Sequence, residues 1–359
     1  MFIIHNFISR SGYNHYSHLV KVLIDQHLPF VFAHGGANTQ VEQTKTALER
    51  AGVEVEFLRW WDGRQRGDLI HFFGAPTPAY LQMARQAGLP VLINTLFTDS
   101  CNRSLSRLKR QGWLIRAMLS APFGEGVKQH LPWRSYPQCA HNVVGLEAER
   151  TVLNVVYRAP DERISVVPYG MSAVFINAGP GVRKEPYLIC TGTVTERKNF
   201  VELAQMARTA QTPVLFVGKP YHEGDPYWLR FQKLVDNQWV RYRSHVDSEI
   251  EMAHLLQSAR GFVFMSNYEN WCLSAHEAAV CGLPLLVQDQ NWSRERFGDQ
   301  ARYFPTIGVT SENIARLKQF YQDAPGLPAP EIKIYTWDDV ALQLKAVYER
   351  TLNSKSLSR

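Results

Sequence analysis

Residues 268–286 read YENWCLSAHEAAVCGLPLL, and the organisation of the chain can be worked out from this stretch. A short apolar run at 261–265 precedes it and is typical of a buried strand. Residues 274–279 then read as a helix that ends at Gly282, and a second apolar run follows at 284–287. The order strand, turn, helix, strand predicts one unit of a parallel α/β sheet.

Two carboxylates stand eight positions apart in this stretch. Glu269 lies in the predicted turn, and Glu277 lies about one turn inside the helix. The first turn of a helix has free backbone N–H groups and the positive end of the dipole, so it attracts phosphate. Ser274 and Glu277 also fit a capping box, in which Glu277 only bonds the backbone N–H of Ser274. The spacing alone leaves both roles open for Glu277.

The whole stretch resembles the E-x7-E signature of retaining GT-B glycosyltransferases, of the type called glycosyltransferase family 4 or glycosyl transferases group 1. The usual form is close to E-G-F-G-L-x-x-x-E-A-x-x-x-G-x-P, and here it runs from Glu269 to Pro284. Asn270 and Cys272 replace the two glycines that normally follow the first Glu, a departure that narrows the pocket expected for the donor sugar. The resemblance implies an α/β fold of the GT-B kind, with two Rossmann-like, doubly wound parallel-sheet domains facing a cleft.

Strand and helix patterns alternate along both halves of the chain, which predicts parallel sheets with helices on both faces. In the first half we expect a strand at 2–7, a helix at 13–24 and a second strand at 30–33. The second half starts again with a strand at 187–191, after a segment rich in Gly and Pro at 169–186 that reads as a linker.

The resemblance implies a division into three parts. Residues 1–168 form an acceptor domain, residues 169–336 form a nucleotide-sugar donor domain, and a C-terminal helix at about 337–359 crosses back to the first domain.

Composition supports a globular, cytoplasmic protein. The chain has 359 residues, of which 45% are hydrophobic and 20% charged, which suits two domains. No apolar run approaches the ~20 residues that a spanning helix needs, and the N-terminus lacks a positive leader and a cleavage site. Five scattered cysteines without a C-x-x-C pair favour a reducing compartment. The net charge of +6 favours an anionic ligand or surface, but it is not gathered into an element that reads nucleic acid.

A basic turn follows the strand at 187–191. Gly192 allows close approach of the backbone, and Arg197 and Lys198 place two cations near a helix N-terminus, where they suit a diphosphate leaving group. An ordinary solvated turn is the alternative. The segment resembles the family's G-R-x-x-x-x-K-[GN] element, with Lys198 on the Lys position. Thr193 stands on the Arg position, and Arg197 is the candidate for the missing charge.

Three other positions are assigned by the resemblance. Gly12 matches the glycine loop that the family places under the donor phosphate, although a plain strand-to-helix turn is equally compatible. Val246 lies where the family contacts the nucleobase. Thr98 and Asp99 stand after the fourth strand, where many family members have a His, and we expect them to face the acceptor.

Residues 103–118, RSLSRLKRQGWLIRAM, form a basic stretch in which Arg103, Arg107 and Arg110 recur at helical spacing. Such a segment can lie on an anionic membrane face near a lipid-linked acceptor. It can equally be an ordinary surface helix packed on the sheet, because Gly112 interrupts a long amphipathic run.

Together these features predict an enzyme, a retaining glycosyltransferase that moves a hexose from a nucleoside diphosphate sugar to an acceptor hydroxyl in polysaccharide or glycolipid biosynthesis. UDP-glucose is the expected donor by its frequency in the family. No cofactor or metal is expected, since the sequence has no D-x-D pair. The candidate catalytic residues are Glu269, Lys198 and Arg197. The candidate donor contacts are Gly12, Gly192, Thr193, Asn270, Trp271, Cys272, Leu273, Ser274, Glu277 and Val246.

The expected partners are the nucleotide-sugar donor and a sugar or lipid-linked acceptor, with peripheral contact to the inner face of the membrane through 103–118. Two alternatives stay open. The replacements at Asn270, Cys272 and Thr193 are compatible with a non-catalytic nucleotide-sugar-binding protein, and a GT-B nucleotide-sugar epimerase would share the donor site.

Overall fold

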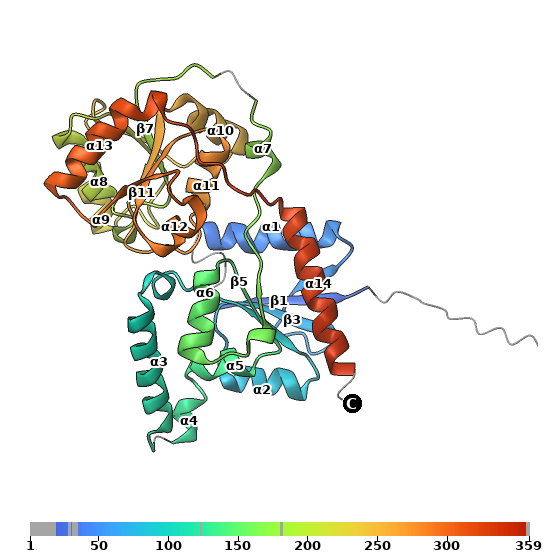
Figure 1. Cartoon of the computed structure of the whole chain (residues 1–359). Helices are drawn as coiled ribbons and strands as arrows, with labels where there is room; N and C mark the ends of the chain where they lie inside the picture. The colour runs from blue at the N-terminus through green and yellow to red at the C-terminus, as the bar shows by residue number, and fades with distance from the viewer. Residues whose placement is uncertain (1–18, 28–29, 31–34, 123, 180–181, 357–359) are drawn as a thin grey trace, which may run out of the picture.

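Among the residues that it describes, the computed structural model contains two parallel sheets of six strands each, joined by an extended segment and by the last helix (Figure 1). It describes residues 19–27, 30, 35–122, 124–179 and 182–356. The strand orders are β2-β1-β3-β4-β5-β6 and β12-β11-β10-β7-β8-β9. We call the part built on the first sheet, 21–166, the first lobe and the part built on the second sheet, 188–323, the second lobe. The expected doubly wound α/β architecture is confirmed.

The strands of the first lobe are β1 (Lys21–Gln26), β2 (Glu54–Phe57), β3 (Leu69–Phe73), β4 (Val91–Asn94), β5 (His141–Val144) and β6 (Ile164–Val166). Its helices are α1 (Gly36–Arg50), α2 (Pro78–Gln86), α3 (Leu105–Ser120), α4 (Glu125–Lys128), α5 (Ser135–Gln138) and α6 (Glu147–Val152). A 3₁₀ turn, η2 (Ser100–Asn102), precedes α3, and a π turn, η4 (Leu153–Tyr157), continues α6.

The strands of the second lobe are β7 (Leu188–Thr191), β8 (Val214–Val217), β9 (Val240–Arg243), β10 (Gly261–Phe264), β11 (Leu285–Gln288) and β12 (Arg302–Phe304). Its helices are α8 (Phe200–Thr209), α9 (Pro226–Gln232), α10 (Glu249–Ser258), α11 (Leu273–Val280), α12 (Asn291–Phe297) and α13 (Ser311–Asp323). The connecting segment carries α7 (Ala173–Ile176), and the chain ends in α14 (Trp337–Ser356). Within the described ranges, no helix is both long and apolar enough to cross a bilayer.

Local sequence explains most of these elements. The central strands are apolar along their length and buried on both faces, as parallel sheets covered by helices require. In α1 the buried residues include Val41, Thr44 and Leu48, which lie on one face of a 3.6-residue period. In α2 the Thr77 side chain accepts a hydrogen bond from Tyr80 N, and Pro78 occupies the first helical position, which together fix the start of the helix.

The first strand differs from its prediction. Residues 21–24 belong to β1, which pairs with β2 and β3 in the first sheet, so the prediction of a helix at 13–24 is wrong over these residues. Four buried residues in a row cannot be assigned to a strand or a helix by periodicity alone. The predicted strand at 2–7 lies outside the described residues. So does the predicted strand at 30–33, except for Phe30, which is in a 3₁₀ turn.

Helix α14 returns to the first lobe and packs against α1, as the GT-B resemblance implies (Figure 1). Asp338 accepts a hydrogen bond from Arg50 Nη2 at 2.6 Å, and Lys345 Nζ donates to Ala51 O at 3.0 Å. Deeper in the interface, Tyr348 Oη lies 2.7 Å from Nδ1 of His71 in β3, and both side chains are fully buried. The C-terminal helix is therefore a structural part of the first lobe.

The two places where the chain passes between the lobes lie side by side. Met171 N donates to Tyr335 O at 2.7 Å, and Met171 forms a parallel bridge with Thr336. A Cβ on Gly170 would lie 2.4 Å from Trp337 Cδ2, so only glycine lets the outgoing segment pass this close to the start of α14.

Replacement Tyr348→Phe tests the docking of α14. It removes one hydroxyl and leaves Nδ1 of His71 buried without its partner, which is expected to lower the free energy of unfolding by about 1–3 kcal/mol in urea titrations. Leu342→Ala on the exposed side of the same helix is the matched control and should change it by less than about 0.5 kcal/mol. Equal stability of Tyr348→Phe and the unaltered protein would contradict this account.

Candidate active site

The candidate site lies between the lobes, at the carboxyl ends of β7 and β10. These two strands pair at the point where the strand order of the second sheet reverses, which is where open α/β sheets bind their ligands. The start of α1 in the first lobe faces this point. A Cβ on Gly35 would lie 3.6 Å from Thr193 Oγ1, and a Cβ on Gly36 would lie 3.7 Å from Leu273 Cδ1.

Two helix N-termini therefore meet at one gap. Helix α1 begins at Gly36 and α11 begins at Leu273, and among the residues that the structure describes no N-cap side chain is hydrogen-bonded to either first turn. Open N–H groups and positive dipole ends at this gap suit a phosphate group. Gly12, which the sequence assigned to the glycine loop, lies outside the described residues, and the sequence reasoning missed Gly35 and Gly36. Their Gly-Gly pair before a helix was visible, but its place depended on assigning β1 correctly.

Lys198 contributes a cation at the same gap. It lies in a short 3₁₀ turn, η6 (Glu196–Lys198), and a Cβ on Gly192 would lie 2.9 Å from its Nζ. Glycine at 192, with a φ of +151°, thus allows the lysine to lie across the turn after β7. The Lys198 charge also lowers the pKa values of Glu277 and Cys272, against the effect of burial, so it acts at the first turns of α11.

Glu277 is a carboxylate available to a ligand. Burial raises its pKa to about 7, and the nearby charge of Glu249 raises it further against the opposite effect of Lys198. No hydrogen bond to its carboxylate is found within the described part of the chain. Helix α11 begins at Leu273, so Ser274 is already its second residue, and the Ser274–Glu277 capping box is not formed. The alternative that Glu277 only caps the helix is therefore wrong.

Glu269 is held by several groups. It is 7% exposed, and its Oε1 accepts hydrogen bonds from Arg197 Nη1 at 2.5 Å and from Ser266 Oγ at 3.3 Å. Arg197 Nη1 also donates to Tyr268 O at 2.8 Å. The Arg197 guanidinium thus positions Glu269, and its direct action on a diphosphate remains a prediction.

The loop that carries Glu269 is bonded to the first lobe. Asn102 Nδ2 donates to Glu269 O at 2.6 Å, and Asn270 Nδ2 donates to Glu149 Oε1 and to Tyr169 Oη, both at 3.2 Å. Glu149 is fully buried, and burial raises its pKa to about 7. The Asn270 side chain is directed to this interface, so its contact with a donor remains a prediction.

Trp271 and Cys272 shape the loop from inside. Trp271 is 3% exposed and stacks on His276 with ring centroids 4.7 Å apart, and Arg296 Cζ lies 4.3 Å from its ring centroid. Cys272 has a φ of 57° and a ψ of 75°, in the left-handed region that favours glycine. This backbone conformation is the physical reason for the glycine that the signature usually carries at this position.

The structure also describes the surroundings of four further predicted site residues. Val246 is buried in the loop after β9, and Ser274 Oγ lies 3.5 Å from Cys272 Sγ. Thr98 O accepts a hydrogen bond from Asn102 Nδ2, and Asp99 forms an ion pair with Arg103. No group of three or more His, Cys, Asp or Glu side chains suited to a metal ion occurs in the described residues.

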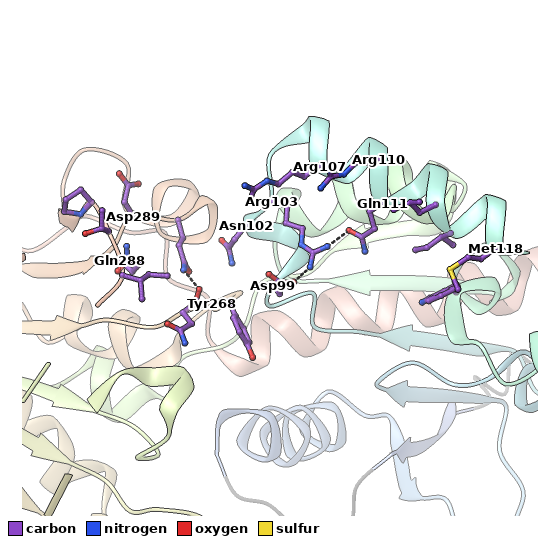
Figure 2. A pocket seen from close by; sticks show the side chains of 18 residues that line it. Asp99, Asn102, Arg103, Arg107, Arg110, Gln111, Met118, Tyr268, Gln288 and Asp289 are labelled. Atoms are coloured by element: carbon purple, nitrogen blue, oxygen red, sulfur yellow. Dashed lines mark hydrogen bonds and ion pairs between the residues drawn. The ribbon is translucent and has the colours of Figure 1, made fainter. Parts of the chain in front are cut away.

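Asp99 borders a separate cleft of about 990 Å³ that is also lined by Tyr268, the residue before Glu269 (Figure 2). One wall is α3, and the other consists of the loops after β10, β11 and β12, including Tyr268 and Asp289. A second ligand bound here would lie next to the Glu269 loop. The gap that is predicted to bind the donor phosphates and the cleft that is predicted to bind the acceptor are thus adjacent.

Comparison with known proteins finds a family match over much of the second lobe. Residues 176–317 match the family Glycosyl transferases group 1. The resemblance stated from residues 268–286 is confirmed over this range, whereas the retaining subtype and membership of family 4 stay predictions. The O-antigen chain mannosyltransferase B of Escherichia coli is 23% identical over 215 residues, which are 54% of this chain and 56% of the relative. The match thus spans little more than half of that relative's length.

Solved structures share the fold at low sequence identity. AviGT4, a glycosyltransferase involved in Avilamycin A biosynthesis, has a TM-score of 0.56 and 18% identity over 93% of this chain and 98% of its own. HepE from Anabaena, solved in complex with UDP-glucose, has a TM-score of 0.54 and 13% identity over 94% and 99% of the two chains. These likenesses establish the GT-B fold.

Replacement Glu277→Gln separates a ligand role from a structural one. Folded Glu277 has a pKa of about 7 against 4.5 unfolded, so the folded chain keeps a proton that the unfolded chain loses, and rising pH destabilises it between about 4.5 and 7. The Glu277→Gln variant has no ionisable group at this position, so its folded state does not lose this free energy as the pH rises. Its free energy of unfolding at pH 8 should equal or exceed that of the unaltered protein, while UDP binding by calorimetry weakens about 10-fold or more. A less stable variant with unchanged UDP affinity would restore a purely structural role.

Proposed function

We propose that this protein is a retaining glycosyltransferase that moves a hexose from a nucleoside diphosphate sugar to an acceptor hydroxyl. The observation that carries the proposal is the meeting of two uncapped helix N-termini with Lys198 and the open Glu277 carboxylate at one gap. Such a gap suits a diphosphate flanked by hydroxyls. The complex of HepE with UDP-glucose supports a uridine nucleotide, and we propose glucose as the sugar.

Each group has a role that follows from its position. Lys198 and the first N–H groups of α1 and α11 stabilise the negative charge that grows on the departing diphosphate. Glu277 accepts hydrogen bonds from the ribose hydroxyls. Glu269, fixed by Arg197, orients the donor sugar and stabilises positive charge at its anomeric carbon.

The reaction needs no separate protein base. The bond between the anomeric carbon and the diphosphate oxygen breaks while a bond to the acceptor oxygen forms on the same face of the sugar. The departing diphosphate oxygen takes the proton of the acceptor hydroxyl. Closure of the lobes excludes water, which limits hydrolysis of the donor.

The arrangement also supports separate binding of the acceptor and the donor by different parts of the chain. We assign the acceptor to residues 1–168 together with residues 337–359, which include α14, and the donor to residues 169–336. The exposed Trp113 on α3 supports peripheral contact with the inner face of the membrane. The biosynthetic product is then a polysaccharide or a glycolipid, in line with the named role of the Escherichia coli relative.

A non-catalytic nucleotide-sugar-binding protein is the second candidate. The left-handed Cys272 and the replacement of the family's Arg by Thr193 favour it, since both alter the donor site without closing it. A panel of nucleoside diphosphate sugars tested by thermal shift identifies the donor, because a ligand that binds only the folded state raises its melting temperature. Slow release of free sugar and diphosphate from that donor identifies a transferase, whereas binding without release identifies a binding protein. An altered sugar on the nucleotide, without acceptor, identifies an epimerase.

Replacement Lys198→Ala should lower the rate of sugar release from the donor by about 100-fold or more, because the growing charge on the diphosphate loses its cation. Lys233→Ala, at the exposed end of α9, removes a lysine of the same lobe and should leave the rate unchanged. The rate is measured as liberated nucleoside diphosphate. Near-normal release by Lys198→Ala would contradict the role given to this residue.

A further inference from the structure

The cleft between α3 and the second lobe begins at the reaction centre. Tyr268, which lines it, precedes Glu269 in the chain. Asn102 also lines it and donates from Nδ2 to Glu269 O at 2.6 Å. From Asn102 the cleft follows α3, so successive turns of this helix border positions farther and farther from Glu269 (Figure 2).

The cleft carries more positive charge than its acidic side chains neutralise. Three arginines line it: Arg103 lies just before α3, and Arg107 and Arg110 lie on α3. Arg103 is bound to Asp99 and to Gln111 Oε1, the latter at 2.9 Å. Arg107 and Arg110 have no hydrogen-bond or ion-pair partner among the described residues.

The acidic groups of the cleft do not compensate these two arginines. Asp99 is paired with Arg103, and Asp289 on the opposite wall accepts hydrogen bonds from Arg294 at 2.7 and 2.8 Å. Arg107 and Arg110, three residues apart on one face of the helix, thus present two uncompensated guanidinium groups to the cleft. Adjacent guanidinium groups bind phosphate oxygens through several charge-assisted hydrogen bonds.

Beyond the arginines the wall of the cleft becomes apolar. Leu114, Ile115 and Met118 continue the same face of α3, and Trp133 adds an aromatic ring. At 1.5 Å per residue of α3, Met118 lies about 12 Å beyond Arg110 along the helix axis. The cleft therefore offers, in order from Glu269, a polar end, a cationic pair and an apolar end.

We propose that this cleft binds the acceptor, and that the acceptor is a sugar joined through a phosphate group to an apolar chain. Its hydroxyl lies at Glu269, its phosphate lies on Arg107 and Arg110, and its chain lies along Leu114, Ile115 and Met118. This inference rests on the proposed function and specifies the substrate class of the same site.

The test compares two soluble probes that differ in one charge, decyl glucoside and glucosyl decyl phosphate, below their micelle concentrations. UDP is held at saturation so that the gap at Lys198 is filled. The unaltered protein should bind the charged probe about 10-fold or more tightly than the neutral one. Arg107→Gln with Arg110→Gln should abolish this preference. Lys109→Gln is the matched control, since Lys109 is exposed on the same helix and does not line the cleft.

Equal binding of the two probes by the unaltered protein, or a preference that survives the double replacement, overturns the inference. Vesicles with and without 30% phosphatidylglycerol distinguish a membrane headgroup from the acceptor. If the double variant loses only binding to anionic vesicles, the arginines serve the membrane surface and the inference is wrong. UDP binding is measured in every sample. Its absence in the unaltered protein overturns the proposed function itself, whereas intact UDP binding without a charge preference overturns this inference alone.

Discussion

The site depends on the positive electrostatic potential between the lobes, which favours a bound anion. Two helices from different lobes point their uncapped first turns at one gap, and a lysine lies across the turn beside it. Like partial charges at close range repel one another until an anion separates them. The same potential explains why the nearest carboxylate on α11, Glu277, lies deeper in the helix rather than at its tip, where it would occupy the anion's place.

The two replaced glycines of the signature have different physical meanings. Cys272 retains the left-handed backbone for which glycine is the usual residue, so the loop keeps its course at a conformational cost of about 1–2 kcal/mol. Asn270 gives the loop a side chain, and that side chain bonds Glu149 and Tyr169. One replacement therefore preserves the shape of the loop, and the other adds a bond between the lobes.

Sequence reasoning succeeded where the evidence is local. The strand, turn, helix and strand around residues 268–286 are present, because apolar runs and a terminal Gly282 mark them directly. It failed at β1, whose short apolar run fits either element. It also did not assign Gly35 and Gly36 to the site. Contacts between distant segments, such as Arg197 with Glu269, 72 positions apart, leave no trace in local pattern.

The side-by-side crossings at Met171 and Tyr335 confine the covalent connection between the lobes to a single edge. Away from that edge, Asn102 of the first lobe donates a hydrogen bond to the main chain of Glu269 in the second lobe. The placement of the Glu269 carboxylate therefore depends on how the two lobes sit relative to each other, and not on the second lobe alone.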